Sequence, residues 1–241
     1  MLTYEIISKK GERDYNEDYA KAQQHEDSFC FVLADGLGGH GGGAEASELV
    51  AEAILKDFKQ CGETSEAYLK KCFEESQRLL LAEQERQNRQ NEMKTTLIVL
   101  LTDQKTLQWG HIGDSRLYFF HKKRLKQHTL DHSVPQMLAA AGEIKEAEIR
   151  HHPDRNRLLR VMGTQWDSPG YQLSERITCK GKEAILMCSD GFWEWILDKT
   201  MQKTLKKAKS PAEWCHLMEQ ETLKNGTGQK MDNYSAITLF F

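Results

Sequence analysis

The sequence predicts an α+β fold of mainly antiparallel sheets with helices packed on their outer faces. Short runs of alternating apolar residues indicate strands, and several of these runs lie close enough along the chain to pair as hairpins. Amphipathic helical patterns are grouped between strands, without the regular strand–helix alternation of a parallel sheet. Because no repeat, proline-rich linker or low-complexity tract divides the chain, we expect one domain over residues 1–241.

Strands are expected where apolar character alternates or where short apolar runs are bounded by turn residues. The segments that meet this description are Cys30–Ala34, Thr95–Leu101, Thr106–His111, Arg116–Phe120, Ala184–Cys188 and Ser235–Phe240. A basic turn, Lys122–Arg124, follows one of them, and we expect it to be a solvated loop tip without function.

Helices are expected where apolar residues recur at spacings of three and four. The first pattern covers Ala44–Gln60, and the second runs from Ser65 to Asn88. A third helix is expected after Pro211 and ends near Asn225–Gly226.

The composition describes a mildly acidic protein, with 33 Lys and Arg against 36 Asp and Glu and a formal net charge of −3. This balance excludes the basic excess typical of nucleic-acid binders. The longest apolar stretch, Thr95–Thr102, is far shorter than the roughly 20 residues of a membrane helix, and no N-terminal signal is visible. The six cysteines lack metal-site spacing and are expected to be free thiols. We therefore expect a cytoplasmic monomer without a nucleic-acid or membrane partner.

Four acids stand beside predicted strands: Asp35, Asp114 and Asp190 each follow one, and Asp232 precedes the last. A single acid at a strand end is more often a turn cap. Four together repel one another unless a cation lies among them, and hard oxygen ligands select Mg²⁺, Mn²⁺ or Ca²⁺ over zinc. The pattern predicts a metal centre.

Two other phosphate-binding patterns occur in the sequence, and neither has the context that its function requires. Gly36, Gly38 and Gly41 match G-x-G-x-x-G, but no second parallel strand follows within about 30 residues, as a dinucleotide fold requires. Bare glycine backbone instead suits close approach of metal-bound water and phosphate. Cys72 and Arg78 have the spacing of a cysteine phosphatase loop, but they lie in mid-helix among acids that would not activate a thiol.

Motifs along the whole chain resemble those of the metal-dependent type 2C (PPM) serine/threonine protein phosphatases, in their bacterial single-domain form. The matching segments, in the family's order, are Arg13–Asp18, Ala34–His40, Lys94–Leu97, Gly113–Tyr118, Thr129–Ser133, His152–Asn156 with Val161–Gly163, Cys188–Trp193 and Asp232–Asn233. One such motif alone is weak evidence for the family, but the whole series in the family's order is specific to it.

The resemblance implies a four-layer αββα sandwich, two antiparallel sheets flanked by helices, with a dinuclear cleft for two Mn²⁺ or Mg²⁺ ions at one end. It implies that Asp35 bridges both ions and that the Gly36 carbonyl binds the second. The other residues assigned to the metals are Asp190 and Asp232 on the first ion, Glu17 and Asp18 through waters on the second, and Asp114 with Asp190 on a third, weaker ion.

The implied reaction is hydrolysis of phosphoserine and phosphothreonine by direct attack of a metal-bridging water, with Arg13 holding the phosphate. His40 is either a general acid or a group that orients a metal-bound water, and both roles stay open. Three polar residues are expected behind the ligands: Thr96, Ser189 and Asn233. The segment Ser133–Arg160 corresponds to a flap beside the cleft.

The implied partners are proteins phosphorylated on serine or threonine, together with a cognate bacterial kinase. One alternative is a catalytically weak regulatory or binding module of the same fold, although all the metal carboxylates are retained. A link to type VI secretion is a further alternative, based on the Phe192–Glu194 run. A calcium-binding protein would require the D-x-[DN]-x-[DN]-G pattern, which is absent from the sequence.

Overall fold

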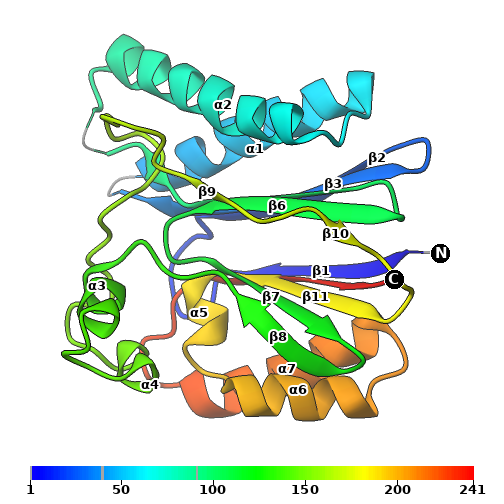
Figure 1. The fold of residues 1–241 in the computed structure, drawn as a ribbon. Coiled ribbons are helices and arrows are strands. Elements are labelled where there is room, and N and C mark those ends of the chain that lie inside the picture. The colour runs from blue at the N-terminus through cyan, green and yellow to red at the C-terminus, as the bar shows by residue number, and fades with distance from the viewer. Residues whose placement is uncertain (1, 39–40, 91) are drawn as a thin grey trace.

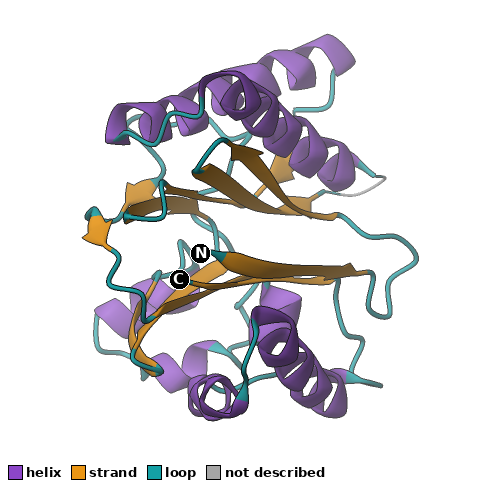
Figure 2. Ribbon diagram, turned by 90° about the vertical axis from the view of Figure 1, so that its right-hand side faces the viewer, coloured by secondary structure: helices purple, strands orange, loops and turns teal. Residues whose placement is uncertain are grey.

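The computed structural model describes residues 2–38, 41–90 and 92–241. Two antiparallel sheets lie face to face, and helices cover the outer side of each (Figure 1). The side view in Figure 2 shows the four layers in the order helices, sheet, sheet, helices. The predicted αββα sandwich is therefore confirmed. Within the described ranges, none of the helices has the length and apolar character needed to cross a membrane.

The first sheet has five strands in the order β1-β12-β11-β7-β8, all antiparallel to their neighbours. Their bounds are β1 Thr3–Lys9, β7 Arg116–His121, β8 Arg124–His128, β11 Glu183–Cys188 and β12 Tyr234–Phe240. Its outer face is covered by α5 Asp190–Trp193, α6 Asp198–Lys207 and α7 Pro211–Gly226. Trp214 of α7 is fully buried there, with its ring edge-on to Phe120 at 5.3 Å between centroids.

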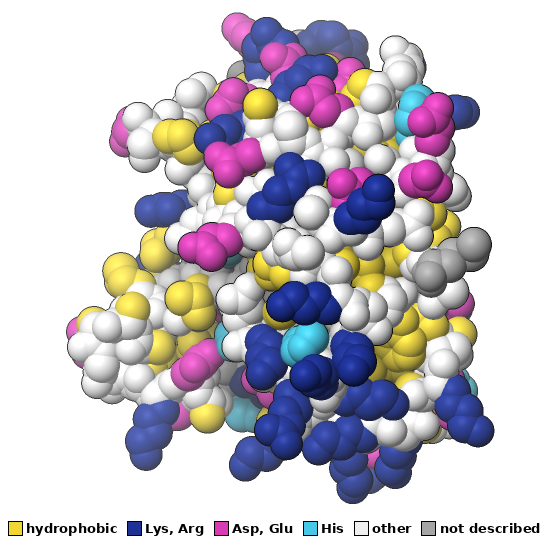
Figure 3. All heavy atoms as spheres, turned by 45° about the vertical axis from the view of Figure 1, so that its right-hand side comes forward, with side chains coloured by type: hydrophobic (Ala, Val, Ile, Leu, Met, Phe, Trp, Pro, Cys, Tyr) yellow, Lys and Arg dark blue, Asp and Glu magenta, His cyan; other side chains and the backbone are white. Residues whose placement is uncertain are grey.

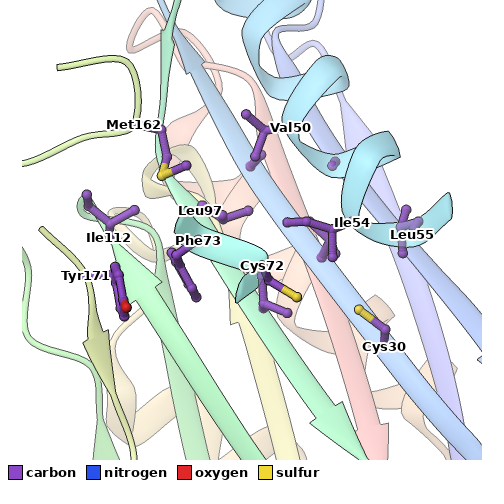
Figure 4. Packing of buried hydrophobic residues seen from close by; sticks show 14 of the residues in the cluster. Cys30, Val50, Ile54, Leu55, Cys72, Phe73, Leu97, Ile112, Met162 and Tyr171 are labelled. Carbon is purple, nitrogen blue, oxygen red and sulfur yellow. The ribbon is translucent and has the colours of Figure 1, made fainter. Parts of the chain in front are cut away.

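The second sheet has the order β10-β6-β5-β3-β2, and two short strands pair with it at β3 and β6. Its strands are β2 Asp18–His25, β3 Ser28–Leu37, β4 Lys94–Thr95, β5 Leu97–Thr102, β6 Thr106–Ile112, β9 Gln172–Leu173 and β10 Ile177–Thr178. The long helices α1 (Gly42–Cys61) and α2 (Glu66–Gln87) cover its outer face. Figure 4 shows Val50, Ile54 and Phe73 from these helices packed toward the strands.

The middle strands are apolar on both faces because both faces are buried. In β3, Cys30 and Val32 face the helices, whereas Phe31 and Leu33 face the other sheet. The layer between the sheets also contains Ile98, Leu100, Leu117, Met187, Ile237 and Leu239, all buried. This apolar, closely packed interior holds the two sheets in one relative position and thereby fixes where their strand ends meet.

The helix ends follow the expected local chemistry. Ser65 caps α2 by accepting the Tyr68 N–H at 3.1 Å, and Asn88 ends it in the left-handed conformation. Ser210 caps α7, whose first residue is Pro211. The three expected helices are confirmed, and the flap segment contains two more, α3 Val134–Ala140 and α4 Glu146–Ile149.

We expect Trp214→Ala to destabilise the protein by about 3–5 kcal/mol, because it leaves a cavity between α7 and the first sheet and removes an indole hydrogen bond to the Met201 carbonyl. The measurement is the free energy of unfolding in urea. Leu223→Ala, on the exposed side of the same helix, is the control and should change it little. Equal losses in the two variants would contradict this account of the packing.

Candidate metal centre

The acids predicted at strand ends meet at one edge of the sandwich. β3 and β6 run in the same direction because each is antiparallel to β5, so Asp35 and Asp114 emerge at the same edge. Asp18, at the start of β2, lies opposite Asp35 in the strand register. In the other sheet, antiparallel β11 and β12 bring Asp190 and Asp232 to the facing edge.

These residues surround a pocket of about 420 Å³ between the two sheets. Its lining includes Arg13, Glu17, Asp35, Gly36, Asp114, Asp190, Asp232 and Asn233. Asp18 is buried directly behind this lining. Of the residues predicted for the site, His40 lies outside the described residues.

The carboxyl groups destabilise one another's charged forms. Removal from bulk water raises the pKa of Asp35 well above its usual value of 3.8, and the neighbouring charges of Asp18 and Asp190 raise it further. Burial likewise raises the pKa of Asp18 to about 7 and that of Asp114 to about 8. The cluster therefore favours any species that adds positive charge among these oxygens.

Two buried oxygens, Glu17 Oε1 and Asp18 Oδ1, have no hydrogen-bond partner among the residues that the structure describes. Unpaired buried carboxylate oxygens are costly, and a hard divalent cation is the ligand that suits an all-oxygen donor set. Across the described ranges, no three His, Cys, Asp or Glu side chains already converge as a closed ligand set. The acids instead line a shared space, and Asp232 is paired with the Arg13 guanidinium at 2.6 Å. The residues present fit divalent cations bound between the two sheets.

A family model described as Protein phosphatase 2C matches residues 8–227. The chain belongs to this family. A relative named Serine/threonine phosphatase stp, from Listeria monocytogenes, is 29% identical over 207 residues, which cover 83% of this chain and 81% of the relative. Membership makes this chain a protein-serine/threonine phosphatase of the metal-dependent class.

Solved phosphatase structures match the whole fold. The Mycobacterium tuberculosis serine/threonine phosphatase PstP/Ppp has a TM-score of 0.86 and 29% identity, with 100% of this chain and 98% of that chain covered. The catalytic domain of PstP in complex with 2 manganese ions has a TM-score of 0.84 and 28% identity, covering 99% and 97% of the two chains.

The link to type VI secretion is not favoured by these comparisons. A structure described as PppA, a key regulatory component of T6SS in Pseudomonas aeruginosa, has a TM-score of 0.83 but only 22% identity, over 99% of this chain and 97% of that chain. At that level of identity the likeness concerns the fold alone.

The three polar residues expected behind the acids hold the acid-bearing segments of this phosphatase in place. Asn233 Oδ1 accepts the Glu17 N–H at 2.8 Å, and Thr96 Oγ1 accepts the Asp35 N–H at 3.0 Å. The Ser189 hydroxyl donates to Asp18 Oδ2 at 2.7 Å, across 171 residues of sequence. Each bond ties a carboxylate-bearing segment to a different strand end.

Gly36 is required because two backbone segments approach it closely. A Cβ at this position would lie 2.2 Å from the Gly43 carbonyl oxygen and 2.7 Å from that of Glu17. The Gly36 N–H donates to the same Glu17 oxygen at 3.1 Å. The absence of a side chain thus allows the start of α1 to pack directly against the strand that carries Asp35.

Sequence reasoning missed three features of this site. Glu194 lies four residues after Asp190, a spacing that could have indicated it. Burial and the charge of Asp114 raise the pKa of Asp190, and the charge of Glu194 raises it further. Glu194 is paired with Arg155 of the flap. Trp193 donates its indole N–H to the Asp114 carbonyl at 2.9 Å, and from the flap Asn156 and Leu158 line the pocket. The resemblance implied that the flap lies beside the cleft, but these individual contacts join segments far apart in sequence and leave no local pattern.

In the chelated protein, we expect stability to fall as the pH rises from about 7 to 8.5. Carboxyl groups with raised pKa values keep protons in the folded state that the unfolded chain has already lost, so raising the pH favours unfolding. Above about pH 7 an unfolded histidine is already mostly neutral and adds little to the slope. The measurement is the Tm in EDTA at several pH values.

The slope should be smaller in Asp35→Asn, which removes one charge from the cluster. Asp57→Asn is the matched control, since Asp57 lies on α1 in an exposed ion pair with Lys71. A chelated Tm that rises over this pH range, or the same slope in both variants, would contradict the electrostatic account.

Proposed function

We propose that this chain removes phosphate from phosphoserine and phosphothreonine in proteins with two Mn²⁺ or Mg²⁺ ions held in the pocket between its sheets. The observation that carries the proposal is the convergence of the strand-end acids on one pocket that also contains Arg13. The family and the manganese-containing PstP structure support the choice of ions.

In this proposal Asp35 would bridge the ions, because the charges of Asp18 in its own sheet and of Asp190 in the other sheet both act on it. Asp190 and Asp232 hold the first ion, and the Gly36 carbonyl holds the second. Glu17 and Asp18 act on the second ion through water, and Asp114 with Asp190 provides a third, weaker site. The unpaired oxygens of Glu17 and Asp18 support their part in this assignment.

Bound divalent ions supply the positive charge that activates water and offsets the charge of the phosphate. The protein's own contribution is to position the reacting groups. Arg13 has a side chain 56% exposed at the mouth of the pocket, where its planar guanidinium can donate two hydrogen bonds to phosphate oxygens. Thr96, Ser189 and Asn233 keep the acid-bearing segments fixed, so little reorganisation accompanies the reaction.

For the cell, we propose that this chain is one catalytic domain over residues 1–241 and that it acts as a cytoplasmic monomer. It reverses phosphorylation by a cognate serine/threonine kinase. His40 keeps both roles, general acid or orienting group, within this proposal.

We expect Asp35→Asn and Asp190→Asn to reduce Mn²⁺-dependent hydrolysis of p-nitrophenyl phosphate and of a phosphothreonine peptide to the level seen in EDTA. Each variant removes a charge that the ions require while leaving the fold's core unchanged. Asp57→Asn serves as the control and should keep wild-type activity. Activity that survives EDTA, or that persists in both cleft variants, would refute the metal-dependent proposal.

Arg13→Ala should raise KM for the phosphopeptide about ten- to a hundredfold, because it removes hydrogen bonds between charged groups worth about 1.5–3 kcal/mol. Steady-state kinetics in saturating Mn²⁺ measures this. Arg176→Ala, an exposed arginine bonded to Thr64 on the second sheet's side, is the control. An unchanged KM would remove Arg13 from the phosphate site.

A further inference from the structure

Three segments far apart in sequence form one surface at the end of the first sheet. The Lys122 N–H in the β7–β8 turn donates to the Lys182 carbonyl at 2.9 Å, and the Leu125 N–H donates to Gln202 Oε1 of α6 at 2.9 Å. Lys123 Nζ lies 3.3 Å from the Lys206 carbonyl at the end of α6. The turn, the loop before β11 and helix α6 are therefore in direct contact.

This surface, which we name the basic face, concentrates much of the protein's positive charge. Its cations are Lys122, Lys123, Arg124, Lys126, Lys180, Lys182, Lys199, Lys203, Lys206, Lys207 and Lys209, and all are exposed. Figure 3 shows Lys and Arg side chains gathered over the lower part of the molecule. A protein with net charge −3 thus has a strongly positive region.

The charges of the basic face are not neutralised within the described part of the chain. None of its lysines or its arginine forms an ion pair with a described carboxylate. The two acids in these segments are already engaged, Glu183 with His121 and Asp198 with Arg150. So many unpaired like charges repel one another, and an anionic partner would relieve that repulsion.

A pocket of about 450 Å³ opens within the basic face. Lys122, Lys123 and Lys182 supply its positive charge, and its apolar part consists of Ala184, Leu205, Phe240 and Phe241. Glu183 also lines the pocket, but its carboxylate is already bonded to His121 and to the backbone N–H groups of Lys180 and Lys182. Leu205 and Ala184 are buried, whereas Phe240 and Phe241 are half-buried, so the floor of the pocket is apolar and lies below the exposed lysines. This arrangement suits one apolar side chain inserted between anionic groups.

We propose that the basic face is a docking site for an acidic segment of a protein partner, anchored by one apolar side chain in this pocket. Charge complementarity identifies the occupant as anionic, and the recessed apolar floor favours an inserted side chain. A membrane-binding surface would present protruding apolar groups, and a site for single-stranded nucleic acid would place exposed aromatic rings at its surface for stacking. The aromatic side chains here, Phe240 and Phe241, are half-buried in the pocket lining. The basic turn Lys122–Arg124 is then part of a binding site, contrary to the expectation of a loop tip without function.

The basic face lies away from the metal centre. β11 leads from Glu183 at this end to Cys188 near Asp190, a span of about 17 Å between the first and last of its six residues. A partner bound here leaves the cleft open and adds affinity without contacting the reacting groups. The inference goes beyond the proposed function and does not rest on it.

The test uses two fluorescein-labelled peptides of 12 residues or so, both rich in Glu and equal in charge, one with a central Phe and the other with Ser in its place. Fluorescence anisotropy at low salt measures Kd for the whole chain. We expect the Phe peptide to bind more tightly, and Lys122→Glu/Lys182→Glu to weaken its binding about tenfold or more. Lys56→Glu/Lys59→Glu, exposed residues of α1 with the same total charge change, should leave Kd within about twofold of wild type.

Hydrolysis of p-nitrophenyl phosphate with Mn²⁺ should be the same in both double variants, which separates loss of docking from loss of folding or catalysis. Equal weakening by both double variants, or equal binding of the Phe and Ser peptides, would overturn the proposal. Tighter binding of a 12-base-pair DNA duplex or of phosphatidylglycerol vesicles than of the Phe peptide would also overturn it, in favour of another class of partner.

Discussion

Mutual repulsion among buried carboxylates is the constraint on which the rest of this structure depends. Burial is the largest cause of the raised pKa of Asp18, Asp35, Asp114 and Asp190, and the charges of neighbouring carboxylates raise each pKa further. Side chains under such repulsion would turn outward unless their backbone were held in place. The apolar layer between the sheets provides that hold, since β3, β5, β6, β11 and β12 are buried along nearly their whole length. The favourable packing of these strands thus offsets the repulsion between the carboxylates and keeps the cluster together.

Hydrogen bonds across the cleft complete this arrangement. Ser189 joins the edge of one sheet to Asp18 of the other, and Asn233 bonds to the Glu17 N–H and to the carbonyls of Lys10 and Tyr15. Neither residue adds charge, so each fixes geometry without increasing the repulsion. Arg13 contributes the opposite charge next to Asp232, and that hydrogen bond is the main reason its own pKa is raised. Positioning and charge compensation are divided between different residues.

The fold could be predicted from sequence where burial left an apolar run or a periodic pattern of apolar residues. β3, β5 and β11 are continuous apolar runs, whereas β1, β2 and β8 are half-exposed, carry many polar residues and were missed. Helix α6 was also missed, because only Met201, Thr204 and Leu205 of its ten residues are buried.

The strand-end acids were visible because each follows or precedes an apolar strand. The roles of Glu17, Asp18 and Arg13 came only from the family resemblance, and the Arg13–Asp232 pair spans 219 residues and leaves no local pattern. The basic face could not be predicted either, because it is formed by three segments that are far apart in sequence.

The distribution of charge along the strands explains why the formal net charge describes this molecule poorly. β7 and β11 each have an acid beyond one end and a lysine beyond the other. Asp114 precedes β7 and Lys122 follows it, whereas Lys182 precedes β11 and Asp190 follows it. A cleft of carboxylates alone would repel a phosphorylated substrate, and bound divalent cations invert that local sign. Attraction of substrate to the cleft therefore depends on metal loading, whereas attraction of an acidic partner to the basic face depends only on the chain's own lysines. The attraction of ligands to these two regions of opposite charge can therefore change independently. Binding of divalent cations changes the attraction of substrate to the cleft, and ionic strength changes the attraction of an acidic partner to the basic face.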